Sequence, residues 1–161
     1  MLNKNQPAVD ILTDLINSTN STFETFRPYE HGELIFKDLT ADFDNGPDAV
    51  KVMAALRSDV DEASWMPVYY KRVSITAFIP DTLPRLPYKD SYIDVHSILA
   101  DINTLLNIQL TSSDVVNFSI DLDHRNKDGT LNVPIMAERN ALIIRGSTAV
   151  VLTDLPEPEK N

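Results

Sequence analysis

The sequence predicts an α+β fold made of two related small units, each a helix packed on an antiparallel β-hairpin plus a strand. Three observations favour this fold class. An amphipathic helical pattern occurs twice, alternating apolar residues follow each copy, and a proline-rich segment lies between the copies. We therefore expect a first α+β unit at residues 1–80, a connector at 81–93, a second α+β unit at 94–153 and a disordered tail at 154–161.

The clearest helical pattern lies at residues 95–106. Its apolar residues recur at intervals of three and four, so they share one face of an amphipathic helix that we expect to pack in the core. Asp94 is a suitable N-cap, Asn107 is a suitable stop, and the Thr-x-x-Asp sequence at 111–114 favours another helical turn. The residues of the apolar face are Val95, Ile98, Leu99, Ile102, Leu105 and Leu106.

A fainter copy of this helix lies 87 positions earlier, at residues 8–23. We expect Asn5 to cap it, Pro7 to lie in its first turn, and the polar run at 17–22 to end it. A few matching apolar positions are weak evidence alone, but the matching order of the following elements strengthens the case for a duplication. The matched positions pair Ile11, Leu12, Asp14, Leu15, Asn20 and Phe23 with Ile98, Leu99, Asp101, Ile102, Asn107 and Leu110.

A hairpin pattern follows the first helix. Apolar residues alternate at 39–43 and again at 50–56, around a polar turn at 44–48. The next segment, 67–79, is rich in β-branched and aromatic residues and predicts one long strand. Residues 65–70 include the one tryptophan and two of the five tyrosines, and core packing is favoured over an exposed recognition surface.

The connector and the second unit follow the same order. Pro80, Pro84 and Pro87 predict an extended segment. Alternation at 118–122 and 131–135 predicts a second hairpin, and matching Val50 with Leu131 lowers the offset from 87 to 81. The final apolar run, 141–152, is interrupted at Arg145-Gly-Ser, which fits either a glycine bulge in one strand or a turn between two short strands.

Composition argues against several kinds of functional site. The chain has no cysteine, which removes disulfides, thiolate nucleophiles and cysteine-based metal sites. Its net charge of −10 disfavours binding to nucleic acid and to anionic membranes. The N-terminal sequence lacks a secretory pattern and no apolar run is long enough to span a bilayer, so we expect a soluble, untargeted protein.

We find no catalytic constellation, no cofactor-binding loop and no metal-ligand spacing in the sequence. His31, His96 and His124 lack partners at ligand spacing, and all three are expected to be solvated. The carboxylates at 121–128 resemble a calcium loop but lack its glycine and glutamate positions. A hydrolase that uses Asp121, Asp123 and His124 is the least favoured hypothesis, and we expect no catalytic, cofactor-binding or metal-binding residues.

Several short motifs resemble a repeat in poorly characterised virion structural proteins of large tailed bacteriophages. They are the helix with its Leu-Leu-Asn stop, the Leu110-Thr-x-x-Asp114-Val turn and the Tyr70-x-Arg72-Val strand. The turn is clear only in the second unit and the strand only in the first. The resemblance implies a non-enzymatic particle component and supplies no catalytic residues.

Two hypotheses of function follow. The first is a structural component of a bacteriophage particle in the virion, and in the host cytoplasm during assembly. It would bind other virion proteins and copies of itself in a symmetric oligomer, through strand edges and hairpin tips. The alternative is an acidic binding module or adaptor that regulates a host or phage protein, which the net charge motivates.

Overall fold

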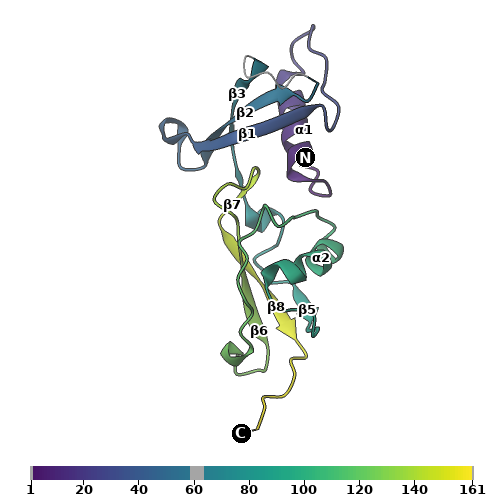
Figure 1. The fold of residues 1–161 in the computed structure, drawn as a ribbon, viewed down its shortest axis with the longest axis vertical. Helices are drawn as coiled ribbons and strands as arrows, with labels where there is room; N and C mark the ends of the chain where they lie inside the picture. Colours follow the sequence, from purple (N-terminus) through teal and green to yellow (C-terminus); the bar gives the residue numbers. More distant parts are fainter. Residues whose placement is uncertain (1, 59–63, 161) are drawn as a thin grey trace.

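The fold is α+β, and the molecule is elongated, with a helix and a three-stranded sheet in each half (Figure 1). The computed structural model describes residues 2–58 and 64–160. In the first half, helix α1 (Ala8–Asn20) precedes strands β1 (Leu34–Ala41), β2 (Ala49–Leu56) and β3 (Met66–Lys71), which form an antiparallel sheet in that order.

The second half combines helix α2 (Val95–Leu106) with a sheet in the order β5-β8-β6. The central strand β8 (Ser147–Thr153) is antiparallel to β6 (Leu131–Met136) and parallel to β5 (Arg85–Pro87). A short parallel pair, β4 (Val73–Ser74) and β7 (Ile144–Arg145), joins the two halves. Neither described helix has the length and apolar character needed to cross a membrane.

Helix α2 begins and ends where its sequence predicts. Asp94 accepts a hydrogen bond from the backbone of Ser97, and the Ser97 side chain caps the backbone of Asp94 in return, which completes a capping box. Asn107 adopts the left-handed conformation with φ 53° and ends the helix. The buried face contains Val95, Ile98, Leu99 and Ile102, while Leu105 is exposed.

Helix α1 begins differently from its prediction but ends within the predicted polar run at 17–22. Pro7, not Asn5, is the N-cap residue, and no side chain caps the first turn. Within this run, the side chains of Thr19 and Asn20 donate to the carbonyls of Leu15 and Ile16 of the same helix. The helix therefore continues to Asn20.

The long strand expected at 67–79 is wrong beyond Lys71. Strand β3 ends there, and Val73 pairs instead with Ile144 in the second half. Ser74 then accepts a hydrogen bond from the backbone of Thr76 and caps a short 3₁₀ helix, Ile75–Ala77. Local β propensity continues through this segment, but pairing with β7 redirects the chain.

The second hairpin, predicted from 118–122 and 131–135, is also wrong. Ser119 makes only an isolated bridge to Asp94, and β6 pairs along its whole length with β8 instead. The segment at 111–114 forms a single turn that does not continue as a helix. The Asp114 carboxylate accepts the N–H of Thr111 at 2.7 Å, and the N–H of Asp114 donates to the Thr111 carbonyl at 3.0 Å. The chain then enters a bridge between Val115 and Ala137.

Gly146 resolves the two interpretations of the run at 141–152. It adopts φ 84° and separates β7 from β8, so the run forms two strands rather than one bulged strand. The two strands belong to different sheets, because β7 pairs with β4 and β8 pairs with β5 and β6.

The segment expected to be a connector contributes to the second half. It is extended at β5, as its prolines predict, but β5 is hydrogen-bonded along β8. Leu86 and Tyr92 of this segment are buried. Buried residues of both halves and of this segment form one core cluster, so the division at 81–93 stays a prediction. Residues 155–160 form no helix or strand, and Asn161 lies outside the described residues.

The backbone pairing of the first half repeats in the second. Adding 81 to a residue number in β1 or β2 gives its counterpart, and adding 82 gives the counterpart in β3. Strands β2 and β6 therefore occupy equivalent positions, and β3 corresponds to β8. The equivalent pairs are Leu34–Leu56 with Val115–Ala137, Val50–Tyr70 with Leu131–Leu152, and Val52–Val68 with Val133–Val150.

The turn before each sheet repeats with the same offset of 81. The backbone N–H of Glu30 donates to the Glu33 carboxylate at 2.8 Å, as the N–H of Thr111 donates to Asp114. In both turns a carbonyl three residues back accepts the N–H of the acidic residue. The Thr-x-x-Asp turn of the second unit thus has a structural counterpart in the first, in which glutamate replaces both the threonine and the aspartate.

A helix asparagine clamps the loop in each half. The side chain of Asn17 both donates to and accepts from the backbone of Tyr29, each at 2.8 Å. The side chain of Asn103 bonds the backbone of Leu110 in the same two-way manner, at 2.8 and 3.0 Å. Tyr29 and Leu110 are again 81 residues apart, so the two units are related in their loops as well as in their strands.

We predict that Ile102→Ala destabilises the protein by about 2–5 kcal/mol, because Ile102 is fully buried and its loss leaves a cavity in the core cluster. Leu105→Ala, on the exposed side of the same helix, is the matched control and should cost less than about 1 kcal/mol. Urea denaturation followed by circular dichroism measures both. Equal losses would contradict this assignment of the buried face.

Candidate interaction surface

The three histidines lie apart from one another. His31 and His124 are exposed, as expected. His96 differs, because it is half-buried and its Nε2 lies 2.7 Å from the carbonyl oxygen of Val115. No cluster of three or more histidine, cysteine, aspartate or glutamate side chains within residues 2–58 and 64–160 could hold a metal ion.

The residues of the hydrolase hypothesis lie together in one exposed 3₁₀ turn. Asp121 accepts the backbone N–H of Asp123 at 2.9 Å, and its other carboxylate oxygen lies 2.7 Å from Nδ1 of His124. The bond from Asp123 and the bond from His124 together lower the pKa of Asp121. The carboxylate therefore caps the turn on the open surface.

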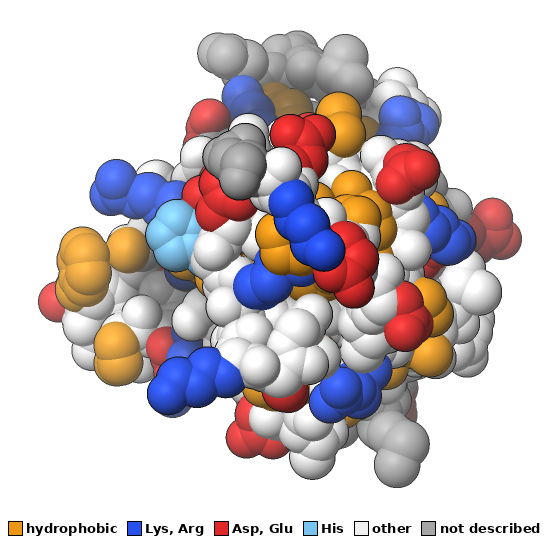
Figure 2. Space-filling model, turned by 90° about the horizontal axis from the view of Figure 1, so that it is seen from below, with side chains coloured by type: hydrophobic (Ala, Val, Ile, Leu, Met, Phe, Trp, Pro, Cys, Tyr) orange, Lys and Arg blue, Asp and Glu red, His pale blue; other side chains and the backbone are white. Residues whose placement is uncertain are grey.

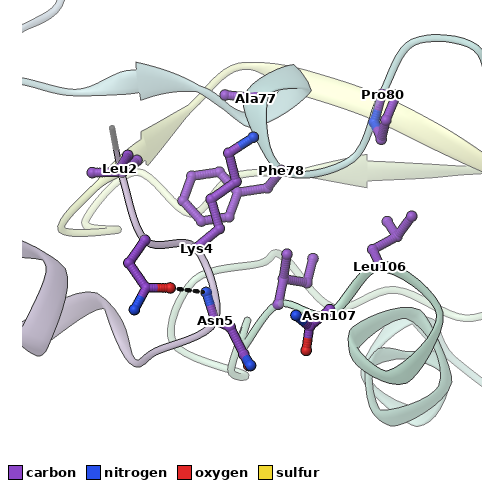
Figure 3. Close-up of a pocket in the computed structure, with 10 residues that line it drawn as sticks. Leu2, Lys4, Asn5, Ala77, Phe78, Pro80, Leu106 and Asn107 are labelled. Carbon is purple, nitrogen blue, oxygen red and sulfur yellow. Dashed lines mark hydrogen bonds between the residues drawn. The ribbon is translucent and has the colours of Figure 1, made fainter.

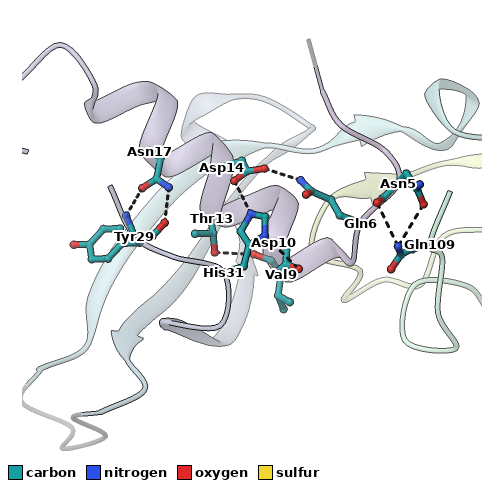
Figure 4. Close-up of polar contacts among 10 residues, drawn as sticks. All are labelled: Asn5, Gln6, Val9, Asp10, Thr13, Asp14, Asn17, Tyr29, His31 and Gln109. Atoms are coloured by element: carbon teal, nitrogen blue, oxygen red, sulfur yellow. Dashed lines mark hydrogen bonds and ion pairs between the residues drawn. The ribbon is translucent and has the colours of Figure 1, made fainter. Parts of the chain in front are cut away.

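His31 bridges the first loop to helix α1 (Figure 4). Its Nε2 lies 2.7 Å from Asp14, and Asp10 lies 3.8 Å from its other ring nitrogen. The bond to Asp14 raises the pKa of His31. Burial opposes ionisation of Asp14, but hydrogen bonds from Gln6 and His31 outweigh it and lower the pKa of Asp14. This pair fixes the loop that leads into β1.

A shallow hollow of about 590 Å³ lies where the N-terminal segment meets the 3₁₀ helix Ile75–Ala77 and the end of α2 (Figure 3). Leu2, Phe78 and Leu106 supply its apolar wall. Lys4 is the one charged residue in its lining. A single lysine against apolar residues gives no acid–base pair, so the hollow has no evident chemistry.

The outer edge of β3 is the best candidate for a binding surface. Within the described residues β3 pairs only with β2, so its other edge is unpaired. Arg72 donates its N–H back to Asp48, beside β2. Because N–H groups alternate in direction along a strand, those of Tyr69 and Lys71 point away from the sheet. Pro67 shares their side, where its missing N–H leaves no gap in the ladder.

The expectation of core packing at 65–70 is wrong for three of its members. Pro67 and Tyr69 lie on the strand face that points to solvent, where Tyr69 is 62% exposed, and Met66 at the start of the strand is 65% exposed. Tyr70 faces inward, and its hydroxyl donates to the carbonyl of Leu142 at 2.8 Å. Burial raises the pKa of Tyr70, so this hydroxyl stays a donor at neutral pH.

An apolar groove of about 230 Å³ runs between β3 and α1. Leu12, Leu15 and Ile16 line it from the helix, and residues 67–70 line it from the strand. An apolar groove next to an unpaired strand edge is the arrangement that binds extended peptides by strand addition. The sequence could not reveal this site, because its two walls are some fifty residues apart and neither carries a motif.

The tip of the first hairpin is a second exposed apolar feature. Phe43 is 84% exposed in the short 3₁₀ helix Phe43–Asn45, which replaces part of the turn expected at 44–48. A single exposed phenylalanine is a contact point rather than a groove. We therefore place the candidate interaction surface at β3 and α1.

Comparison with known proteins identifies one relationship. A family model described as a family of unknown function (DUF7941) matches residues 1–157. No curated protein and no solved structure matches the chain.

We predict that Asp14→Asn lowers the pKa of His31 toward 6.5, because the largest cause of its elevation is the bond to Asp14. The pair stabilises the fold fully only above the unfolded Asp pKa of 3.8 and below the unfolded His pKa of 6.5. Its contribution declines as pH falls through the lowered Asp14 pKa or rises through the raised His31 pKa. NMR titration of the ring protons measures the shift, with Asp10→Asn as the weaker control. An unchanged His31 pKa in Asp14→Asn would contradict the pairing.

Proposed function

The chain belongs to this family of unknown function, and we propose that it is a non-enzymatic structural component of a tailed-bacteriophage particle. Two features support the proposal. The motifs of its helix, turn and strand resemble a repeat of virion structural proteins, and among the described residues the outer edge of β3 is unpaired and suited to contact between subunits.

The edge of β3 carries the proposal. An isolated edge exposes backbone donors and acceptors to water, and monomeric proteins usually protect such edges with charges, bulges or covering segments. Here β3 presents exposed Met66 and Tyr69 beside an apolar groove. A subunit that adds a strand at this edge would satisfy the backbone groups and cover the apolar surface together.

The partners that fit this surface are copies of the chain and other particle proteins. Each copy would occupy a repeated, symmetric position in the virion, after assembly in the host cytoplasm. We propose no nucleic acid or membrane partner, since the net charge of −10 opposes both.

The alternative function, an acidic binding module or adaptor, calls for a surface of one charge sign. Figure 2 shows the end of the molecule that is lowest in Figure 1, and acidic and basic side chains are interspersed there among apolar ones. That face does not present a single-sign surface, so we prefer the assembly function.

We predict that mass spectrometry of purified particles of the encoding phage detects the chain at a fixed ratio to the other structural proteins. Washing at high salt should leave that ratio unchanged for a built-in component. Absence from mature particles, or loss on washing, would overturn the proposed function.

A charge on the β3 edge should reduce incorporation into particles. The double variant Met66→Lys and Tyr69→Lys changes two exposed residues, so we expect it to fold and stay soluble. Its two ammonium groups would oppose the binding of a neighbouring strand at this edge. Ile93→Lys, at a residue 69% exposed in the second half, is the matched control. Particle incorporation is measured for each variant after confirming equal thermal stability. Equal incorporation of the double variant and the control would contradict a role for this edge.

A further inference from the structure

The second unit contains a strand that has no counterpart among the described residues of the first unit. Strand β8 is the counterpart of β3, but its outer edge is covered by β5 in parallel register. Tyr88 donates its N–H to Thr153 at 2.7 Å, and Val151 donates to Pro84 at 2.8 Å. Leu86 between them is 7% exposed, so its side chain is buried in the second unit.

The covering segment also contacts the second helix. Lys89 and the hydroxyl of Tyr92 both bond the carboxylate of Asp101 on α2. In Figure 1, β5 lies on the side of β8 where α2 is found. The position that β5 fills beside β8 and α2 therefore corresponds to the open groove beside β3 and α1.

The register of β5 defines which residues of β3 would face an added strand. Arg85, Leu86 and Pro87 pair with Val151, Leu152 and Thr153. Subtracting the offset of 82 converts these three partners into Tyr69, Tyr70 and Lys71 of β3. A residue equivalent to Leu86 would then lie opposite Tyr70, on the sheet face that the groove and α1 share.

The sequence of β5 specifies what can fill such a position. Leu86 supplies the buried side chain, Pro87 follows where no N–H is needed, and Tyr88 supplies the next donor. The same order occurs in the C-terminal tail at Leu155-Pro156-Glu157, where a leucine is followed by a proline and then by a residue that has a backbone N–H. In its own chain Leu155 is half-buried against the core cluster, and the Pro156 carbonyl accepts a hydrogen bond from Arg125 at 2.9 Å. Asp154 has φ 55° there, so addition to a second copy exchanges these contacts for those of the groove and makes Asp154 extended.

We propose that the tail of a second copy, residues 154–160, adds as a parallel strand to the outer edge of β3. Leu155 then enters the groove opposite Tyr70, Asp154 lies opposite Tyr69, and Glu157 lies opposite Arg72. This inference rests on the proposed function in one respect, since it names the self-contact by which copies of the chain assemble.

Charge and geometry favour a second copy as the source. The tail carries three acidic residues and one basic residue, Lys160, and β3 ends at the exposed Lys71. The C-terminus lies at the opposite end of the elongated molecule from β3, so a chain does not supply its own tail (Figure 1). The contact joins two different surfaces, and repetition of it builds a ring or a filament.

Cross-linking of the full-length chain tests the register. The protein has no cysteine, so Asp154→Cys and Tyr69→Cys can be introduced singly and the two variants mixed under an added oxidant. Residues opposite each other on neighbouring strands lie within the span of a disulfide. We expect a mixed dimer of these two variants, and none from Asp154→Cys mixed with the control Ile93→Cys. A dimer formed by Tyr69→Cys alone would instead indicate β3 pairing with β3 and overturn the proposal.

Self-association tests the role of the leucine. In sedimentation velocity of the full-length protein, Leu155→Asp should weaken association about tenfold or more, and Glu159→Gln, beyond the paired residues, about twofold or less. A labelled peptide of residues 153–160 should bind full-length Leu155→Asp protein, and the same peptide with Leu155→Asp should not.

Unchanged association of Leu155→Asp, or failure of the unmodified peptide to bind, would overturn the tail contact. Either result leaves the proposed function to be decided by the particle composition. Loss of the chain from purified particles would in turn overturn the proposed function without affecting a tail contact seen by cross-linking.

Discussion

The backbone donors and acceptors at the outer edge of a sheet must find partners or remain in water, and the two halves of this protein meet that requirement differently. The second half covers β8 with its own strand β5. The first half leaves the outer edge of β3 unpaired within the described residues. The pairing of β2 with β3 has the same register as the pairing of β6 with β8. The two sheets therefore differ at this edge in whether a further strand covers it.

Contacts between the two halves hold the end of β3, and with it the open edge, in place. After β3, Arg72 donates Nη1 to the carbonyls of Arg139 and Ala141, and Val73 pairs with Ile144. Asp48, at the base of β2, forms an ion pair with Arg145 at 2.6 Å. These contacts fix the end of β3 to the second half, and one core cluster runs through both. A groove on such a support keeps its shape before a partner arrives, which favours binding.

Much of the fold could be predicted from local sequence, and the reasons are physical. Helix α2 has an apolar stripe, a capping pair and a left-handed stop, all of which act within a few residues. The exit of the chain at Arg72 could not be predicted, because pairing with β7, some seventy residues later, overrides the β propensity of 73–79. The failed hairpin at 118–122 has the same origin, since β6 finds a more distant partner in β8.

The duplication was visible in the helices but hidden in the turns. The carboxylates of Glu33 and Asp114 each accept a backbone N–H from the residue three positions earlier. The residues differ between the two turns, since the donors are Glu30 and Thr111. An acidic residue directly before Leu34 of β1 and another directly before the bridge residue Val115, 81 positions apart, were the available signal. The candidate binding surface had no such signal, because exposure of an edge depends on which strands are neighbours.

Amide hydrogen exchange of Tyr69, compared with that of its counterpart Val151, shows directly whether assembly covers the β3 edge. The N–H of Val151 is bonded to Pro84, directly before β5, whereas that of Tyr69 points to the open edge. We expect fast exchange of Tyr69 in dilute protein and slow exchange in the assembled state, with Val151 protected in both. Protection of Tyr69 in dilute protein, or equally fast exchange after assembly, would contradict an edge that assembly covers.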